Sequence, residues 1–141
     1  MVKIKKIMKP AVLVPPGATK KQILKTVKRY PTADIFIVAG KNKKFLGDIH
    51  ENDLFYMLLP NKIYEEIGVQ LAFDLEKKFW SRTAREIMRK HDVTCQEDDD
   101  AINVALKFAR VEVNEMPVLN KKRQVVGVID QGRLLRHMKI Q

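Results

Sequence analysis

The chain has very little cysteine, few glycines and prolines, and no long apolar run. Its single cysteine, Cys95, cannot form an internal disulfide, and one thiol without matching Cys and His neighbours is no zinc site. Six Gly and six Pro among 141 residues, with 45% hydrophobic residues, exclude a disordered tail and a disulfide scaffold. No apolar run approaches the roughly 18 residues of a membrane span, and none fits a signal peptide. These absences predict a folded cytoplasmic protein that does not enter a membrane.

The sequence repeats itself with an offset of 80 residues. The recurring residues keep this spacing without a gap: Ile7-Met8 and Ile87-Met88, Val38 and Val118, Lys41 and Lys121, Gly47 and Gly127, Ile49 and Ile129, and Leu54 and Leu134. A fixed internal period indicates two copies of one structural unit. We therefore expect a first repeat over residues 1–59, a linker over 60–82 and a second repeat over 83–141, which together make one compact module.

Hydrophobic periodicity and turn residues predict the same elements in both copies, in the order β-α-β-β-α. In the first copy, Thr19 is a plausible N-cap for the first helix, and Asn52-Asp53 caps the second helix. The predicted elements of that copy are a strand over 12–14, a helix after 19, strands over 35–38 and 45–49, and a helix over 54–59. Those of the second copy are a strand over 93–95, a helix over 101–109, strands over 116–119 and 124–129, and a helix over 131–138.

The segment that joins the copies is predicted to be an amphipathic helix. Apolar residues recur there at every fourth position: Ile63, Ile67, Leu71, Leu75 and Phe79. This spacing places them on one face of a helix. Two interpretations stay open, because a wide apolar face either covers the core of its own chain or packs across a dimer interface.

Both copies resemble the cystathionine-β-synthase (CBS) domain, a family whose members occur in tandem pairs called Bateman modules. The resemblance rests on Ile-Met at the start of each copy, Pro117-Val118 in the middle strand, a Gly-x-hydrophobic step in the last strand, and Asp53 at the final helix. It implies an α+β fold of two β-α-β-β-α repeats, packed with pseudo-twofold symmetry and joined by the helical linker. It also implies a sensor that binds an adenine nucleotide or S-adenosylmethionine in a cleft between the repeats.

The family motif Gly-x-hydrophobic-Thr/Ser-x-x-Asp implies a ligand site in the first copy. That copy keeps Gly47, Ile49 and Asp53, and His50 stands where the hydroxyl residue is expected. In the family, the acid binds the ribose hydroxyls, and a carboxylate at a helix start suits a vicinal diol. The adenine is then expected against the first strand, formed by Val12, Leu13 and Val14. From spacing alone, Asp53 is better explained as a helix cap, and it is the family motif that makes a ligand contact an equal alternative.

The second copy departs from this motif at two positions. Asp130 stands at the hydroxyl position, and Arg133 stands where the family has its acid. A ribose grip of the family type is therefore not expected there, although both residues remain candidates for ligand contact. Asp130 and Arg133 lie three residues apart at a helix start, where they can also pair with each other.

The net charge of +10 supports an alternative function, because a positive field attracts polyanions. Clustered cations are expected at both hairpin turns and on the last helix: Lys41, Lys43 and Lys44; Lys121, Lys122 and Arg123; Arg133, Arg136 and His137. No aromatic stacking motif lies between these charges. The alternative is a basic module that binds nucleic acid or a partner protein, with a degenerate nucleotide site.

Catalysis and metal binding are not expected. His91 and Cys95 lack a supporting acid or base, and the acidic run over 97–100 is explained by the dipole of the helix that follows it. The sequence therefore predicts a non-enzymatic regulatory protein whose partners are a small adenosine ligand, a second copy of itself and an effector protein.

Overall fold

A computed structural model of the chain describes residues 2–58, 81–91 and 93–139. These residues form two compact units. The first-repeat unit comprises Val12–Gly40 and Leu46–Lys90, and the second-repeat unit comprises Met1–Ala11, Lys41–Phe45 and His91–Gln141. Nearly all of the helix predicted over 60–82 lies outside the described residues. Among the described residues, no helix has the length and apolar character needed to cross a bilayer.

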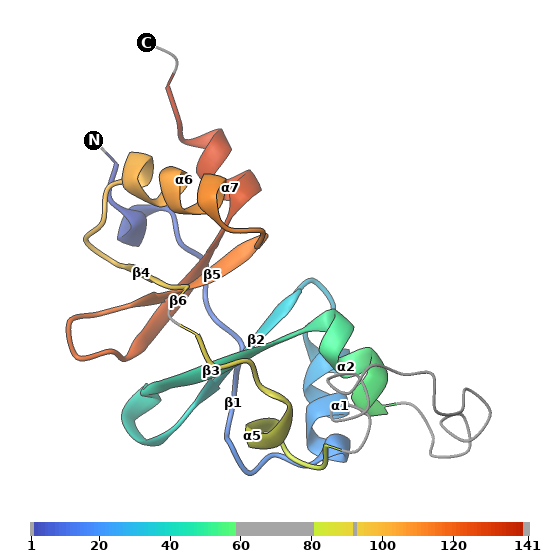
Figure 1. Cartoon of the computed structure of the whole chain (residues 1–141). Helices are drawn as coiled ribbons and strands as arrows, with labels where there is room; N and C mark the ends of the chain where they lie inside the picture. Colours follow the sequence, from blue (N-terminus) through green and yellow to red (C-terminus); the bar gives the residue numbers. More distant parts are fainter. Residues whose placement is uncertain (1, 59–80, 92, 140–141) are drawn as a thin grey trace. The chain divides into compact units, whose positions relative to one another are not determined.

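The first-repeat unit is built on a three-stranded sheet in the order β1-β2-β3. Strand β1 (Leu13–Val14) pairs in parallel with β2 (Ile35–Ala39), and β3 (Phe45–His50) lies on the other side of β2. Helices α1 (Lys20–Arg29) and α2 (Glu51–Leu58) lie side by side (Figure 1). Thr19 caps α1 as predicted, because its hydroxyl accepts the Gln22 N–H while the Gln22 side chain accepts the Thr19 N–H.

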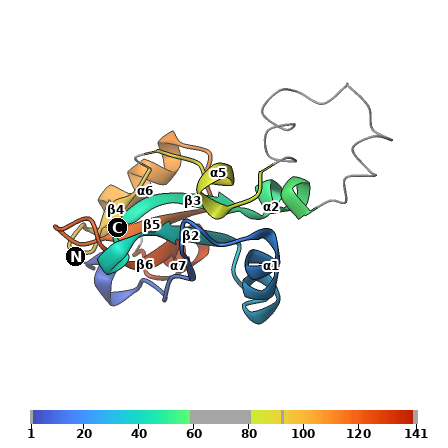
Figure 2. The ribbon, with the colours of Figure 1, turned by 90° about the horizontal axis from the view of Figure 1, so that it is seen from below.

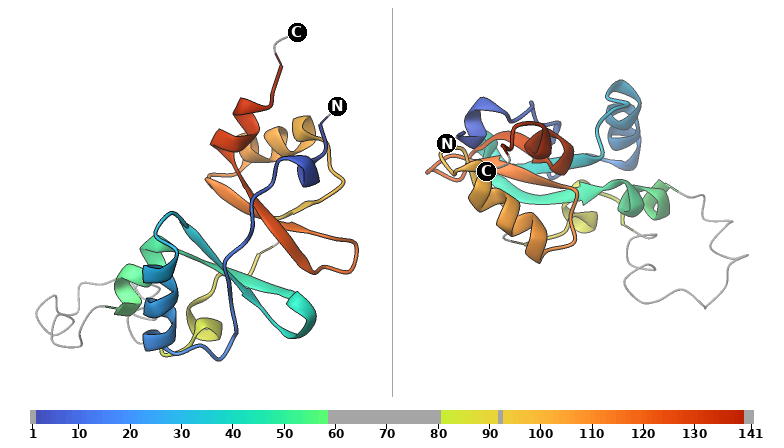
Figure 3. Two further views of the ribbon diagram at one scale, coloured as in Figure 1. Left: turned by 180° about the vertical axis from the view of Figure 1, so that it is seen from behind. Right: turned by 90° about the horizontal axis from the view of Figure 1, so that it is seen from above.

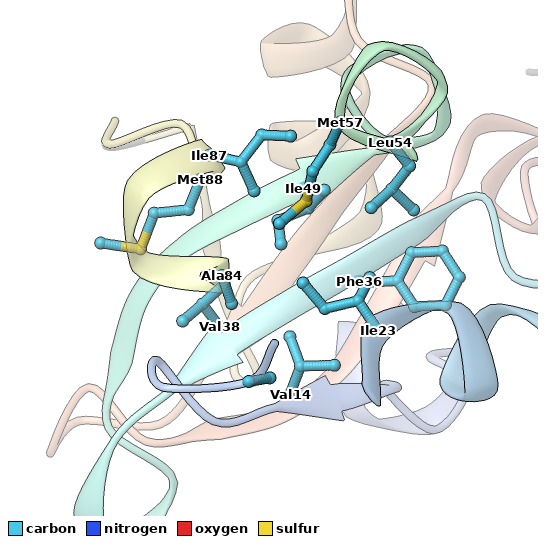
Figure 4. Packing of buried hydrophobic residues seen from close by; sticks show 11 residues of the cluster. Val14, Ile23, Phe36, Val38, Ile49, Leu54, Met57, Ala84, Ile87 and Met88 are labelled. Atoms are coloured by element: carbon cyan, nitrogen blue, oxygen red, sulfur yellow. The ribbon is translucent and has the colours of Figure 1, made fainter. Parts of the chain in front are cut away.

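The core of the first-repeat unit includes residues from the start of the second repeat. Val14, Ile23, Phe36 and Ile49 are buried between sheet and helices, and Ala84, Ile87 and Met88 pack against them (Figure 4). Residues 84–87 form the short helix α5 (Ala84–Ile87), which lies next to β3 (Figure 2). Burying one large apolar side chain stabilises a fold by about 1.5–3 kcal/mol. The second Ile-Met pair therefore anchors its segment to this unit.

The second-repeat unit has a matching sheet in the order β4-β5-β6. Strand β4 (Cys95–Gln96) is parallel to β5 (Glu115–Leu119), which is antiparallel to β6 (Val125–Asp130). Helices α6 (Ala101–Arg110) and α7 (Gln131–Arg136) contact each other over this sheet.

The N-terminal segment packs into the second-repeat unit. Ile4 and Ile7 are buried in its core, and Ile4 lies in the short helix η1 (Ile4–Lys6). Lys9 forms an antiparallel bridge with Val128 of β6, where the segment runs beside the strand (Figure 3). The backbone N–H at the start of α6 donates to the Val2 carbonyl at 2.9 Å. The segment thus satisfies one of the free N–H groups of the helix start.

Most predicted boundaries agree with the structure to within one residue, but three elements differ by two or three residues. The strand predicted over 93–95 is Cys95–Gln96, because only these residues pair with β5. The last helix ends at Arg136 instead of Met138. Helix α2 begins at Glu51 instead of Leu54, which places Asp53 inside the first helical turn and not before it.

Candidate functional site

The Asp53 carboxylate lies where α2 follows β3. His50 ends β3, and its backbone N–H donates to Asp53 Oδ2 at 3.2 Å. An acid in the first turn that reaches back to the preceding backbone N–H is one half of a capping box. Asp53 is therefore not the N-cap residue that was predicted. It binds the backbone of the residue before the helix, and its carboxylate is held over the helix start.

Arg89 binds both oxygens of this carboxylate. Its Nε donates to Asp53 Oδ2 and its Nη2 donates to Oδ1, each at 2.9 Å. The Asp53 side chain has no exposed surface, whereas 45% of the Arg89 side chain is exposed. The hydrogen bonds from Arg89 to Asp53 are the main cause that holds the pKa of Arg89 above its ordinary value. A parallel, two-point contact of this kind is among the strongest ion pairs in proteins.

Gly47 brings Arg89 to this position. Asp48 and Arg89 exchange two backbone hydrogen bonds, of 3.1 and 2.8 Å, in an antiparallel bridge. A Cβ atom on Gly47 would lie 2.6 Å from the Arg89 carbonyl oxygen and 3.0 Å from the Met88 sulfur. The glycine of the family motif thus allows the segment after Ile87-Met88 to lie against β3, which sets Arg89 beside Asp53.

His50 faces a second carboxylate. Its Nε2 lies 3.2 Å from Oδ1 of Asp48, whose side chain is almost fully buried. The imidazole is partly exposed, so it reaches both Asp48 and the surface. Since Nε2 faces Asp48, a contact between His50 and a bound phosphate would be made by Nδ1 or would require the ring to turn.

The other candidate residues of the first copy differ in what they offer a ligand. Val14 and Ile49 are buried in the core (Figure 4). Val12 and Leu13 are only partly buried, and the Val12 carbonyl accepts the Ile37 N–H at 2.9 Å. Successive side chains of a strand face opposite sides of the sheet, and Val12 packs with Val14 against the core, so an adenine ring on the other side of this strand would rest on Leu13.

The second-repeat unit pairs its charges differently. Asp130 caps α7 by accepting the Arg133 backbone N–H at 2.6 Å, so the predicted contact between Asp130 and Arg133 is made by the backbone. Lys9 lies 2.7 Å from Glu115 Oε1 and 3.1 Å from Asp130 Oδ2. Since Arg133 replaces the acid at the motif position, this unit has no carboxylate equivalent to Asp53.

The ion pairs of Lys9 set the titration of their partners. Burial alone raises the pKa of Asp130, but the Arg133 N–H and the Lys9 ammonium outweigh it and hold that pKa below its ordinary value. Burial likewise lowers the pKa of Lys9, and Glu115 and Asp130 together hold it above its ordinary value. Lys9 and Asp130 are therefore both ionised near neutral pH.

Sequence reasoning missed Arg89 and Lys9, although a signal for them exists. Each follows an Ile-Met pair, and their numbers differ by the same 80 as the other repeated positions (89 minus 9). Both lie beside the last strand of a sheet and pair with acids near its end.

Cys95 is a buried core residue, as predicted. Burial is the main cause that raises the pKa of its thiol to about 12, and Sγ lies 3.7 Å from the Pro117 carbonyl oxygen. A thiol with so high a pKa carries almost no thiolate at neutral pH.

An apolar cavity of about 180 Å³ opens between α6 and α7 of the second-repeat unit. It is lined by Ala105, Phe108, Ala109, Gln131, Leu134, Leu135 and Met138. Large apolar side chains are exposed on the same two helices and just beyond α7: Ile102, Leu106, Leu135 and Met138. Leu135 is the most exposed of them, with 67% of its surface accessible.

Known proteins share both the sequence pattern and the fold. The sequence model of the CBS domain matches residues 84–140. The crystal structure of CBSX2 in complex with AMP superposes with a TM-score of 0.76 at 14% identity, covering 96% of this chain and 95% of that one. CBSX2 is a CBS-pair protein from Arabidopsis thaliana. The chain has the fold of a CBS domain pair.

Two further solved structures share the fold of this chain. One is the CBS domain pair of protein MJ0100 in complex with 5′-methylthioadenosine and S-adenosyl-L-methionine, with a TM-score of 0.72, 21% identity, and coverage of 96% and 94% of the two chains. The other is the cytosolic domain of the Mg²⁺ channel MgtE in complex with ATP, with a TM-score of 0.73, 20% identity, and coverage of 96% and 48%.

Curated relatives of this chain are much longer proteins. L-aspartate semialdehyde sulfurtransferase from Methanocaldococcus jannaschii is 29% identical over 72 residues, which are 50% of this chain and 14% of the relative. The enzyme of the same name from Methanosarcina acetivorans is 26% identical over 106 residues, which are 70% of this chain and 21% of the relative. The chain thus spans about a seventh to a fifth of their length.

Proposed function

We propose that this CBS pair is a regulatory module that binds an adenosine-containing ligand at Asp53 and passes its occupancy to an effector protein. The carrying observation is the Asp53 carboxylate, fixed at the start of α2 and held there by a two-point ion pair. The solved relatives support the ligand class, since their structures contain AMP, ATP, or S-adenosylmethionine with methylthioadenosine.

The candidate ligand residues of the first-repeat unit fit a nucleoside in type. A carboxylate accepts hydrogen bonds from two adjacent ribose hydroxyls, and partly exposed aliphatic side chains suit the faces of an adenine. Leu13 provides such a side chain in the edge strand β1. The second-repeat unit has Arg133 in place of the acid, so we propose one ribose site for each chain.

We propose a binding function without catalysis. The chemistry of a sensor needs only differential affinity between two states, typically worth about 1–3 kcal/mol of coupling free energy. The only thiol of the chain is buried and its pKa is raised to about 12, so it is no nucleophile.

Calorimetric titration tests the ligand proposal. We expect saturable binding of AMP, ADP, ATP or S-adenosylmethionine near one equivalent per chain. Asp53→Asn should weaken it at least roughly tenfold, because hydrogen bonds to a charged group contribute about 1.5–3 kcal/mol. Asp98→Asn is the matched control, since Asp98 is an exposed acid outside the first-repeat unit and should bind as the wild type does.

If titration of the folded protein with all four ligands gives no heat, the alternative function, a basic module that binds nucleic acid or a partner protein, is favoured instead. One observation supports that alternative: the two basic turns come together in the second-repeat unit, where Phe45 N–H donates to the Arg123 carbonyl at 3.0 Å. Six exposed cations are thereby gathered: Lys41, Lys43, Lys44, Lys121, Lys122 and Arg123. Binding of nucleic acid there would weaken steeply between about 50 and 200 mM salt.

We further propose that the CBS pair forms a homodimer through the exposed apolar face of α6 and α7. Exposed apolar side chains around a cavity are typical of association surfaces. Leu135→Lys should convert the dimer into a monomer in analytical ultracentrifugation, because it puts a charge at the most exposed apolar position. Tyr30→Lys, at a half-exposed aromatic residue of the other unit, should leave the dimer intact. A wild-type chain that sediments as a monomer at high micromolar concentration would contradict this proposal.

A further inference from the structure

Arg89 occupies the carboxylate that the proposed function assigns to a ribose. Both oxygens of Asp53 accept hydrogen bonds from its guanidinium at 2.9 Å. A ribose diol must reach the same carboxylate, whose oxygens can each accept more than one hydrogen bond but which has no exposed surface while it is paired with Arg89. Arg89 and a ribose therefore compete for Asp53, and ligand binding must displace the guanidinium.

The structure favours movement of the Arg89 side chain over movement of its backbone. The backbone is fixed by the bridge to Asp48 and by its close contact with Gly47. The side chain is 45% exposed, whereas Asp53 has no exposed surface. Rotation of the side chain into solvent is thus the shortest way to open the carboxylate, and it leaves β3 and α2 in place.

A displaced Arg89 keeps its positive charge, because a guanidinium does not lose its proton in proteins. Its separation from Asp53 costs free energy unless another anion replaces the carboxylate. A 5′-phosphate supplies such an anion on the same ribose ring that has taken Asp53. A free 5′-hydroxyl or a thioether supplies none, and a sulfonium repels the guanidinium.

We propose that Arg89 makes this site selective for 5′-phosphorylated adenosine compounds over uncharged ones. The inference rests on the proposed function, since it requires an adenosine compound bound at Asp53. Guanidinium groups bind phosphates by paired hydrogen bonds, so Arg89 exchanges the Asp53 carboxylate for the 5′-phosphate and keeps a two-point contact. The second-repeat unit contains no such exchange, because Lys9 there is a single-point cation held by Glu115 and Asp130.

The affinity ratio of AMP to adenosine measures this selectivity. We expect the wild type to bind AMP at least roughly tenfold more tightly than adenosine in calorimetry at constant ionic strength. Arg89→Gln should bind adenosine more tightly than the wild type and AMP less tightly, so that the ratio falls toward one. A role of Arg89 in stability alone would weaken both ligands by the same factor and leave the ratio unchanged.

A third ligand and two further variants locate the effect. The gain in affinity of Arg89→Gln should be absent with 2′,3′-dideoxyadenosine, which lacks the hydroxyls that bind Asp53. Arg85→Gln is the matched control, because Arg85 is an exposed arginine of the same segment and should keep the wild-type ratio. Arg89→Lys keeps the charge without the two-point grip, so it should bind adenosine more tightly and still prefer AMP. This variant also replaces Arg89→Gln should that chain not fold.

The outcomes separate this inference from the proposed function. If the wild type binds AMP and adenosine equally, or if Arg89→Gln weakens both alike, the selectivity of Arg89 is wrong while the adenosine site stands. If neither the wild type nor the Arg89 variants bind any adenosine compound, the proposed function itself is wrong, and this inference with it.

Discussion

Gly47→Ala is expected to lower the free energy of unfolding by about 1–3 kcal/mol, the usual range for an overpacked buried site. The new methyl carbon would lie 2.6 Å from the backbone oxygen of Arg89, and a backbone atom cannot turn aside as a side chain can. The bridge between β3 and the segment after α5 must therefore open. Urea or thermal denaturation, followed by circular dichroism, measures the loss.

The chain provides a repeat of this experiment and a control for it. Gly127 lies 80 residues further on, and its Cβ would lie 2.8 Å from the Lys9 carbonyl oxygen, so Gly127→Ala should destabilise by a similar amount. Gly17→Ala should change stability little, since no heavy atom lies within 4 Å of the added carbon. Equal unfolding midpoints for Gly47→Ala and Gly17→Ala would contradict the close packing of Arg89 against β3.

The elements of each repeat were predictable because they depend on local pattern. Strand β2 and residues 116–119 of β5 are apolar runs that are buried along their whole length, and the Thr19 cap depends on residues only three positions apart. The errors fall at short elements. Strand β4 has two residues, so its position is set by pairing with β5 and not by its own sequence.

The candidate site was only half predictable, because its partners lie far apart in the chain. Asp53 was found from its motif, but the pair it forms spans 36 positions to Arg89, and Lys9 pairs with Glu115 across 106. No periodicity or spacing rule connects residues at such separations. The fold brings them together because the segment that opens each repeat packs into the core of the unit containing most of the other repeat.

Because the opening segments are exchanged in this way, Lys9 and Arg89, which follow the two Ile-Met pairs, lie at equivalent positions in the two units. Their contacts differ. Each runs antiparallel to the last strand of a sheet, at Asp48 in one unit and at Val128 in the other. In the first-repeat unit the cation meets one buried acid that also lies at the proposed ligand site. In the second-repeat unit it meets two acids, and the motif acid is absent. We infer that the second cation stabilises the unit and that the first one also responds to ligand.

Lys9→Met is expected to destabilise the second-repeat unit by about 2–3 kcal/mol at pH 7. Lys9 Nζ lies 2.7 Å from the Glu115 carboxylate, which is 4% exposed, and removing a partner from a buried ion pair costs about 3–5 kcal/mol. We expect less than this, because the Lys9 side chain is 29% exposed and water screens part of the interaction. Met keeps the length of the side chain, so the loss reports charge and not packing.

An exposed ion pair in the same segment provides the control for this buried one. Lys5 pairs with Asp98 at 3.0 Å, but both side chains are about half exposed, so Lys5→Met should change unfolding very little. Adding Glu115→Gln to Lys9→Met should restore much of the lost stability, because the charge that Lys9 neutralised is then gone. The ion pair between Lys9 and Asp130 makes stability depend on pH. The pKa of Asp130 is lowered in the folded chain, so its contribution to stability is complete above the ordinary carboxyl pKa and is lost as the pH falls through the lower folded value. If Lys9→Met and Lys5→Met unfold alike at pH 7, the opening segment is held by Ile4, Ile7 and its backbone hydrogen bonds, and the ion pairs of Lys9 add nothing to the stability of this unit.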